Sequence, residues 1–190
     1  MFVRTRPGST TRDPLVGSFV RVFVLGLDPG LSRCGYALLE PARGGTARAV
    51  ALGVLTTPAA HPVPQRLAEL QRDIRALFDE HHPDVMAVER VLFQVNVRTA
   101  MAVGQASGLA MAEAAGRGCE VVQYSPNEVK QAVTGYGAAT KMQVQSMVQT
   151  LLELAVLPSP PDAADAAALA LCHLAMAPTR RAVERAEARP

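Results

Sequence analysis

The sequence predicts an α/β fold: a five-stranded mixed sheet, with three antiparallel strands and two parallel ones, flanked by helices. Three short apolar runs joined by tight turns come first, which is typical of an antiparallel meander. Apolar runs and segments of helical periodicity then alternate, which is typical of parallel strands. A chain of 190 residues with 49% hydrophobic residues is long enough to bury such a core.

The first half of the chain supplies four of the expected strands. The three antiparallel strands are expected at residues 22–27, 35–40 and 47–55. Apolar residues then recur at steps of three and four from 65 to 81, which predicts an amphipathic helix that ends before Pro83. The run 85–88 predicts the fourth strand, and Glu89 closes it.

The segment 98–115 has helical spacing and carries small residues at every fourth position. These are Ala100, Gly104, Gly108 and Ala112. Such a stripe lets another backbone approach closely, either the protein's own sheet or a second subunit. The residues alone favour packing within the chain.

The second half of the chain predicts a fifth strand, at 119–124, and three further helices. Ser125 and Thr140 each stand three residues before Glu or Gln, the pattern of a capping box. The helix after Thr140 is expected to end near Leu154. After the break Pro158-Ser-Pro-Pro161, Asp162 is expected to open the last helix as its N-cap.

Composition predicts one domain over residues 21–178, a flexible extension over 1–20 and a frayed charged tail over 179–190. The chain has three cysteines without C-x-x-C spacing, which argues against disulfides and zinc and favours a reducing cytoplasm. The apolar run 163–177 is shorter than the roughly 20 residues of a membrane span, so no membrane segment is expected.

The net charge of +2 does not by itself indicate a nucleic-acid-binding protein. The basic residues are almost all arginines. Only Lys130 and Lys141 are lysines, and they stand close together late in the chain. These two are therefore the exceptions that a special role would explain.

Four acids stand at the ends of expected elements. Asp28 and Glu89 each follow a strand, so their carboxylates converge if the two strands are neighbours. Asp162 and Asp165 share one face of a helix. Taken singly, Asp28 in Asp-Pro-Gly is better explained as a turn residue, and the other pair as a helix N-terminus.

Together, four acids without a nearby set of His or Cys ligands suit a hard divalent cation, Mg²⁺ or Mn²⁺. Two such ions can support hydrolysis of a phosphodiester bond. A pair of carboxylates serving glycoside hydrolysis fits the spacing equally well. His173 lies too far along the last helix to join the group and is expected to be a partly buried structural histidine.

Five segments together closely resemble the RuvC family of crossover junction endodeoxyribonucleases, the bacterial Holliday junction resolvases. They occur in order between Val22 and Pro178, and they read GLDPGLSRCGYAL, VERVLFQVN, GQASG, SPNEVKQAVTGYGAATKMQVQSMV and PDAADAAALA. The resemblance implies an RNase H-like fold. It also implies a nuclease that resolves four-way junctions by paired symmetric nicks, in recombination and DNA repair.

The resemblance implies roles for particular residues. The catalytic and metal-binding residues are Asp28, Glu89, Asp162 and Asp165, holding two Mg²⁺ ions per subunit, for which Mn²⁺ is expected to substitute. The expected DNA-contacting residues are Lys130, Lys141, Arg90, Arg98, Leu92 and Phe93. Many relatives have an aromatic residue at position 92, so either Phe93 takes that role or base stacking is weaker here.

The family acts as a homodimer on four-way junction DNA, together with the branch-migration motor formed by RuvA and RuvB. Under the resemblance, the helix 98–115 becomes the expected dimer contact, which reverses the preference from the residues alone. Three rival functions remain: a module that binds branched DNA without cutting it, an actin-like ATPase or sugar kinase, and a nuclease for RNA–DNA hybrids. The four intact acids argue against the first, and the single Asp-x-Gly opening argues against the second.

Overall fold

The computed structural model describes residues 22–42, 46–90 and 97–187, except the side chains of 97–99 and 181–187. Its strands form one sheet in the order β3-β2-β1-β4-β5. Their bounds are β1 Val24–Asp28, β2 Arg33–Pro41, β3 Ala47–Thr56, β4 Val85–Glu89 and β5 Glu120–Tyr124. The β1–β2 and β2–β3 pairs are antiparallel, whereas β1–β4 and β4–β5 are parallel. The predicted mixed sheet is confirmed.

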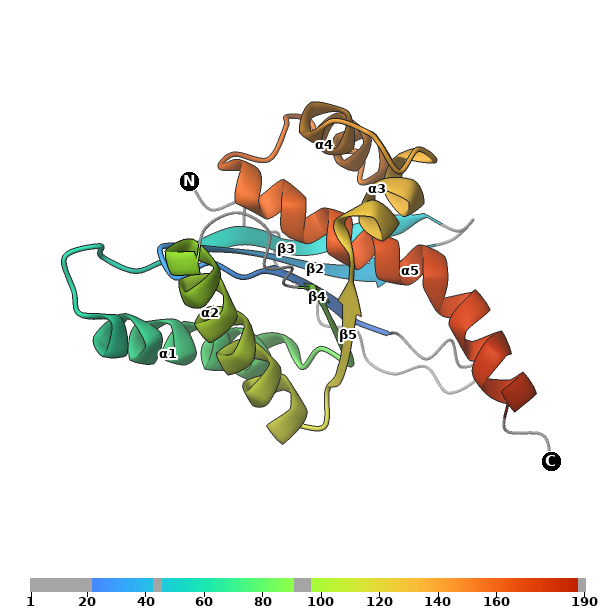
Figure 1. Cartoon of the computed structure of the whole chain (residues 1–190). Coiled ribbons are helices and arrows are strands. Elements are labelled where there is room, and N and C mark those ends of the chain that lie inside the picture. Colours follow the sequence, from blue (N-terminus) through green and yellow to red (C-terminus); the bar gives the residue numbers. More distant parts are fainter. Residues whose placement is uncertain (1–21, 43–45, 91–96, 188–190) are drawn as a thin grey trace.

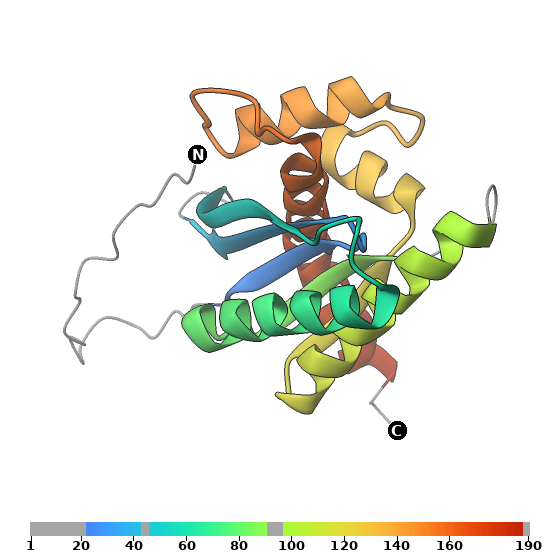
Figure 2. The ribbon, with the colours of Figure 1, turned by 90° about the vertical axis from the view of Figure 1, so that its left-hand side faces the viewer.

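The helices cover the sheet on both faces, which gives three layers (Figure 1; Figure 2). On one face lie α1 and α2, and on the other lie α3, α4 and α5. Their bounds are α1 Val63–His81, α2 Val97–Gly116, α3 Pro126–Thr134, α4 Lys141–Leu151 and α5 Pro161–Glu187. Because α5 lies directly on the sheet, α3 and α4 pack against its outer side.

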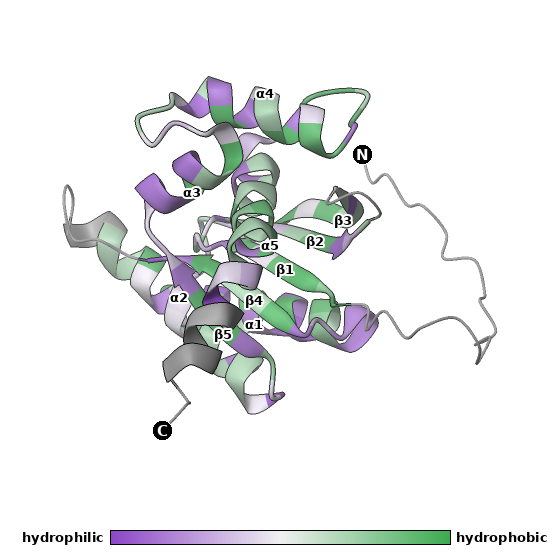
Figure 3. Ribbon diagram, turned by 90° about the vertical axis from the view of Figure 1, so that its right-hand side faces the viewer, coloured by the Kyte–Doolittle hydropathy of each residue, from purple (hydrophilic) through white to green (hydrophobic). Residues whose placement is uncertain are grey.

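Two hydrophobic cores hold these layers together, one on each face of the sheet. Strand residues point alternately to the two faces. Leu25 therefore packs with Ile74 of α1, whereas its neighbour Val24 packs with Ala166 of α5. Apolar residues accordingly follow β1, β4 and the sheet-facing side of α5 in Figure 3.

A buried carboxylate joins α1 to α2. Glu113 of α2 accepts hydrogen bonds from Gln71 at 2.5 Å and from Arg75 Nη2 at 2.7 Å, both on α1. Arg117, directly after α2, donates a further bond at 2.6 Å. Hydrogen bonds, first from Arg75, lower the pKa of Glu113 to about 2. This charge is thus fully compensated.

Both predicted capping boxes are present, at Ser125 before α3 and at Thr140 before α4. The last helix differs from the prediction. Since α5 begins at Pro161, a residue suited to a first helical position, Asp162 lies inside the first turn instead of acting as the N-cap. The same helix continues past Pro178 to Glu187, through a segment of good helix formers. It therefore enters the segment 179–190 that was expected to be a frayed tail.

The small-residue stripe of α2 does not face the sheet. A Cβ added at Gly104 or Gly108 would meet no atom within 4 Å among the described residues. The buried apolar positions of this helix are instead Ala106, Ala110 and Ala114. The prediction from the residues alone, that the stripe packs within the chain, was therefore wrong. Among the described residues, no helix is long and apolar enough to span a bilayer.

Candidate active site

Two of the predicted acids lie side by side at one edge of the sheet, the edge formed by the carboxyl ends of the central strands β1 and β4. The parallel register of β1 and β4 pairs Leu27 with Val88, so Asp28 and Glu89 follow at the same level. Both strands end at this point. The convergence that the sequence made conditional on strand adjacency therefore occurs.

Two glycines bring the last helix down onto this edge. A Cβ at Gly26 would lie 1.9 Å from the carbonyl oxygen of Ala166, and one at Gly35 would lie 2.0 Å from that of Asp162. Any side chain at either position would push α5 away, because real Cβ atoms essentially never approach so closely. The glycines thus fix the height of the α5 N-terminus, and with it Asp162 and Asp165, above the strand ends.

The acids share a hollow of about 340 Å³ with both lysines of the chain. Its lining residues are Asp28, Glu89, Pro126, Val129, Lys130, Lys141, Val144, Asp165, Ala168 and Leu169. Asp162 lies beside this hollow without lining it, yet its charge acts on Asp28. Residues from β1, β4, α3, α4 and α5 therefore meet at one point.

The carboxylates crowd one another. Burial, followed by the charges of Asp165, Glu89 and Asp162, raises the pKa of Asp28 from 3.8 to about 7, although Lys141 opposes this shift. Burial and Asp165 likewise raise the pKa of Glu89. In this protein the edge thus carries more negative charge than its surroundings offset.

Lys141 supplies part of the missing positive charge. Its Nζ lies 2.6 Å from Oδ2 of Asp165. The hydrogen bond with Asp165, and then the other acids, raise the pKa of Lys141. The ammonium is therefore held on the carboxylate that stands over Asp28 and Glu89, within the same hollow as Lys130.

A second cation at this edge, Arg33, was missed by the sequence analysis. Its Nε lies 3.4 Å from Oδ2 of Asp162, and about 59% of its side chain is exposed. That oxygen is buried and has no hydrogen-bond partner among the described residues, so the contact is electrostatic rather than a formed hydrogen bond. Arg33 stands five residues after Asp28, and that closeness in the sequence was the available signal.

The remaining predicted DNA contacts are less well placed. Arg90 is exposed directly after β4, and its backbone N–H donates to the carbonyl of Tyr124 at 2.8 Å. Leu92, Phe93 and the side chain of Arg98 lie outside the described residues. Their roles stay predictions.

The acids do not form a closed metal site as they stand. In the described part of the chain, no three side chains of His, Cys, Asp or Glu are grouped so that they could hold an ion. Asp165 is instead paired with Lys141. The site offers only carboxylate oxygens, the donor type that Mg²⁺ prefers, and its excess of negative charge and the unpartnered oxygen of Asp162 favour an added cation.

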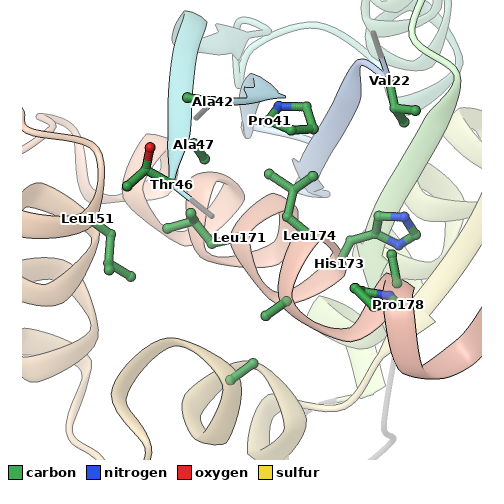
Figure 4. A pocket seen from close by; sticks show the side chains of 13 residues that line it. Val22, Pro41, Ala42, Thr46, Ala47, Leu151, Leu171, His173, Leu174 and Pro178 are labelled. Atoms are coloured by element: carbon green, nitrogen blue, oxygen red, sulfur yellow. The ribbon is translucent and has the colours of Figure 1, made fainter. Parts of the chain in front are cut away.

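A larger hollow, of about 440 Å³, lies at the opposite end of the sheet (Figure 4). It is lined mostly by apolar residues, among them Val22, Pro41 and Ala47, and none of its described lining residues is acidic. His173 on its wall is buried, and its Nδ1 lies 2.9 Å from the hydroxyl oxygen of Tyr124. His173 thus lies away from the acids, as predicted, and it is fully buried rather than partly buried.

Comparison with known proteins agrees with this arrangement. The family model described as crossover junction endodeoxyribonuclease RuvC matches residues 24–173. The RuvC of Chloroflexus aggregans is 49% identical over 155 residues, which cover 82% of this chain and 94% of the relative. The RuvC of Mycobacterium leprae is 48% identical over 165 residues, 87% of this chain and 88% of that protein.

A solved structure agrees as well. The structure of Thermus thermophilus RuvC in complex with a Holliday junction substrate matches with a TM-score of 0.79 and 31% identity, over 84% of this chain and 96% of that one. The RNase H-like fold implied by the resemblance is therefore confirmed. The chain belongs to the RuvC family of crossover junction endodeoxyribonucleases.

Proposed function

We propose that this protein is a Mg²⁺-dependent, structure-selective DNA endonuclease that resolves four-way junctions by paired symmetric nicks. One observation carries the proposal: Asp28, Glu89 and Asp165 share a single hollow with both lysines, in a chain of the RuvC family. Acids that can hold hard cations and ammonium groups that can meet phosphate are the two requirements of metal-assisted phosphodiester hydrolysis.

The four acids, Asp28, Glu89, Asp162 and Asp165, would hold two divalent cations. When bound, such a pair of ions activates a water and stabilises the leaving oxygen of the scissile phosphodiester. The crowding that raises the pKa of Asp28 supports this assignment, because a cation offsets the repulsion among the carboxylates. Mn²⁺, with similar oxygen preference, is expected to substitute for Mg²⁺.

Lys141 would serve the substrate from this hollow. Its ammonium lies 2.6 Å from Asp165, and its side chain lines the hollow. There it would lie beside the DNA backbone and offset phosphate charge, with Lys130 on the same wall. Arg33 and Arg90 would extend this basic rim, and Arg98, Leu92 and Phe93 keep their predicted DNA contacts.

Two subunits would act together. The open stripe on α2, where a Cβ at Gly104 or Gly108 would meet no described atom within 4 Å, supports the homodimer contact that the resemblance implies. A twofold axis through such a self-complementary contact matches the near symmetry of a four-way junction. Engagement of RuvA and RuvB stays a prediction of the resemblance. The three free buried cysteines support the cytoplasm as the compartment.

The test offers the purified protein a labelled four-way junction, a linear duplex with the same arm sequence and an RNA–DNA hybrid, each in Mg²⁺. Paired nicks in the junction alone are the expected result. Cleavage of the hybrid instead would assign an RNA-directed nuclease of the same fold. Binding of the junction without cleavage, in Mg²⁺ and Mn²⁺ alike, would replace the proposal with a non-cleaving branched-DNA binding module.

A further inference from the structure

The turn that follows Asp28 is tightly folded. Residues 29–32 connect β1 to β2, and Asp28 pairs with Gly35 at the base of this connection. A Cβ at Gly30 would lie 2.2 Å from the carbonyl oxygen of Arg33, so only glycine fits there. The side chain of Leu31 is buried and anchors the turn in the core. Movement of this turn would therefore move the end of β1.

Two residues far along the sequence hold the same turn from outside. Thr57, directly after β3, donates from Oγ1 to the carbonyl of Leu31 at 2.6 Å, and its N–H donates to the carbonyl of Ser32 at 3.3 Å. Arg66, in the first turn of α1, donates from Nε to Oγ1 of Thr57 at 3.0 Å and from Nη2 to Oγ of Ser32 at 2.6 Å. We call these four residues, Leu31, Ser32, Thr57 and Arg66, the turn clasp.

The turn clasp joins three parts of the chain that are distant in the sequence. It links the end of β3 and the start of α1 to the turn, and the turn continues directly from Asp28. The guanidinium reaches two hydroxyl oxygens with separate nitrogens, a fork that a lysine ammonium cannot reproduce. Thr57 is buried, so its hydroxyl cannot be replaced by bulk water without cost.

Asp28 needs such support because the neighbouring acids repel its carboxylate. Repulsion from the neighbouring acids acts directly on its carboxylate, and the strand ends at this residue. A carboxylate that must bind an ion in one orientation needs a backbone that does not shift under that repulsion. Side-chain hydrogen bonds from Thr57 and Arg66 hold this turn at Leu31 and Ser32.

We propose that Arg66 and Thr57 are positioning residues: the turn clasp holds the backbone after Asp28 so that its carboxylate is oriented to bind a divalent cation. This inference rests on the proposed function, because it concerns the same metal site. Neither residue touches the acids. They act through the turn alone, and the proposal therefore predicts effects on metal binding that exceed any general loss of stability.

The experiment measures two properties of the full-length protein without DNA. The first is Mn²⁺ affinity by calorimetry, and the second is hydrogen exchange of a peptide spanning residues 29–33. Thr57→Val keeps the shape of the side chain and removes its hydroxyl, whereas Thr57→Ser keeps the hydroxyl. We expect Thr57→Val to bind Mn²⁺ about tenfold more weakly and to exchange faster in this peptide, and Thr57→Ser to restore both. Arg66→Lys should behave as Thr57→Val does.

Arg75→Lys is the matched control. It removes a second guanidinium fork from the same helix, but one that holds Glu113 of α2 rather than the turn. This variant should lose thermal stability and keep wild-type Mn²⁺ affinity. If Thr57→Val does not fold, Arg66→Lys against Arg75→Lys makes the same comparison.

Three results would overturn the inference. The first is Mn²⁺ affinity that stays at the wild-type value in Thr57→Val and Arg66→Lys, whatever happens to exchange. The second is an equal loss of affinity in Arg75→Lys, which would indicate a general structural effect. The third is a wild-type protein that binds no Mn²⁺, which would also remove the metal site of the proposed function. If the wild-type protein binds Mn²⁺, the third result is excluded, and the first two results then test the positioning role alone.

Discussion

Two groups in this chain, Glu113 with its hydrogen-bond donors and the cluster of acids around Asp28, place carboxylates in opposite electrostatic surroundings. Glu113 lies between α1 and α2 and accepts hydrogen bonds from Arg75, Gln71 and Arg117, which lower its pKa to about 2. Asp28 lies at the sheet edge among three other acids, where burial and repulsion raise its pKa to about 7. The first group is arranged to stabilise the fold, whereas the second is retained at a cost to stability, as expected of a functional site.

The largest expected contrast between the two groups is in catalysis. Asp28→Asn should lower junction cleavage by about a thousandfold or more, because the amide removes a charged ligand of the proposed ions. Glu113→Gln should cleave within about threefold of wild type, because it lies on the helices away from the acids. Gel assays of a labelled junction in Mg²⁺ measure both.

Binding separates catalysis from recognition in this comparison. In Ca²⁺ or EDTA, both variants should bind the junction as wild type does. Equal loss of binding and cleavage in Asp28→Asn would indicate that this residue maintains the fold of the site rather than its chemistry.

The next contrast is in stability. Glu113→Gln should lower the melting temperature of the metal-free protein by about 4–8 °C, because the two guanidinium groups lose their charged acceptor. Differential scanning calorimetry at neutral pH measures this shift. An unchanged melting temperature would mean that Glu113 does not hold α1 against α2.

The pH dependence of stability sharpens the same point. Because the folded-state pKa of Glu113, about 2, lies below its ordinary value of 4.5, the stabilisation is complete above about pH 4.5 and is lost as the pH falls toward 2. The free energy of unfolding, measured with urea, should therefore fall more steeply over this pH range in wild type than in Glu113→Gln. Parallel curves for the two proteins would contradict the compensated state of Glu113.

The smallest expected effect concerns Lys141. If its ammonium meets one phosphate, Lys141→Gln should lower the slope of log affinity against log salt for the junction by about 0.9. Arg72→Gln, which removes an exposed charge from α1 on the other face of the sheet, is the matched control and should leave the slope unchanged. Fluorescence anisotropy over a range of salt, in Ca²⁺ so that the acids hold a cation, measures it. Equal slopes for Lys141→Gln and wild type would remove Lys141 from the DNA interface.

The sequence was most informative where a signal lies within one element. Apolar runs predicted all five strands to within two residues, and capping boxes at Ser125 and Thr140 predicted the starts of α3 and α4. Acids at strand ends predicted that Asp28 and Glu89 converge once β1 and β4 proved to be neighbours. Periodicity and local motifs are sufficient for such features.

The sequence was silent where partners are distant. Arg75 and Glu113 are 38 residues apart, and Arg66 and Ser32 are 34 apart, so no local pattern marks either contact. The outward face of Gly104 and Gly108 was also unpredictable, because a small-residue stripe fits either a sheet or a second subunit. Only tertiary packing decides which arginine is structural and which supports the site.

The melting temperature of Asp28→Asn, with and without Mg²⁺ at about pH 8, tests most directly that the acid cluster is an under-compensated cation site. Since the folded-state pKa of Asp28 is raised from 3.8 to about 7, the cost of its charge grows as the pH rises through this range. Without metal, Asp28→Asn should therefore melt about 3–6 °C above wild type. Mg²⁺ should raise the melting temperature of wild type and leave that of the variant nearly unchanged. A variant that melts below wild type without metal, or that gains as much from Mg²⁺, would contradict the account.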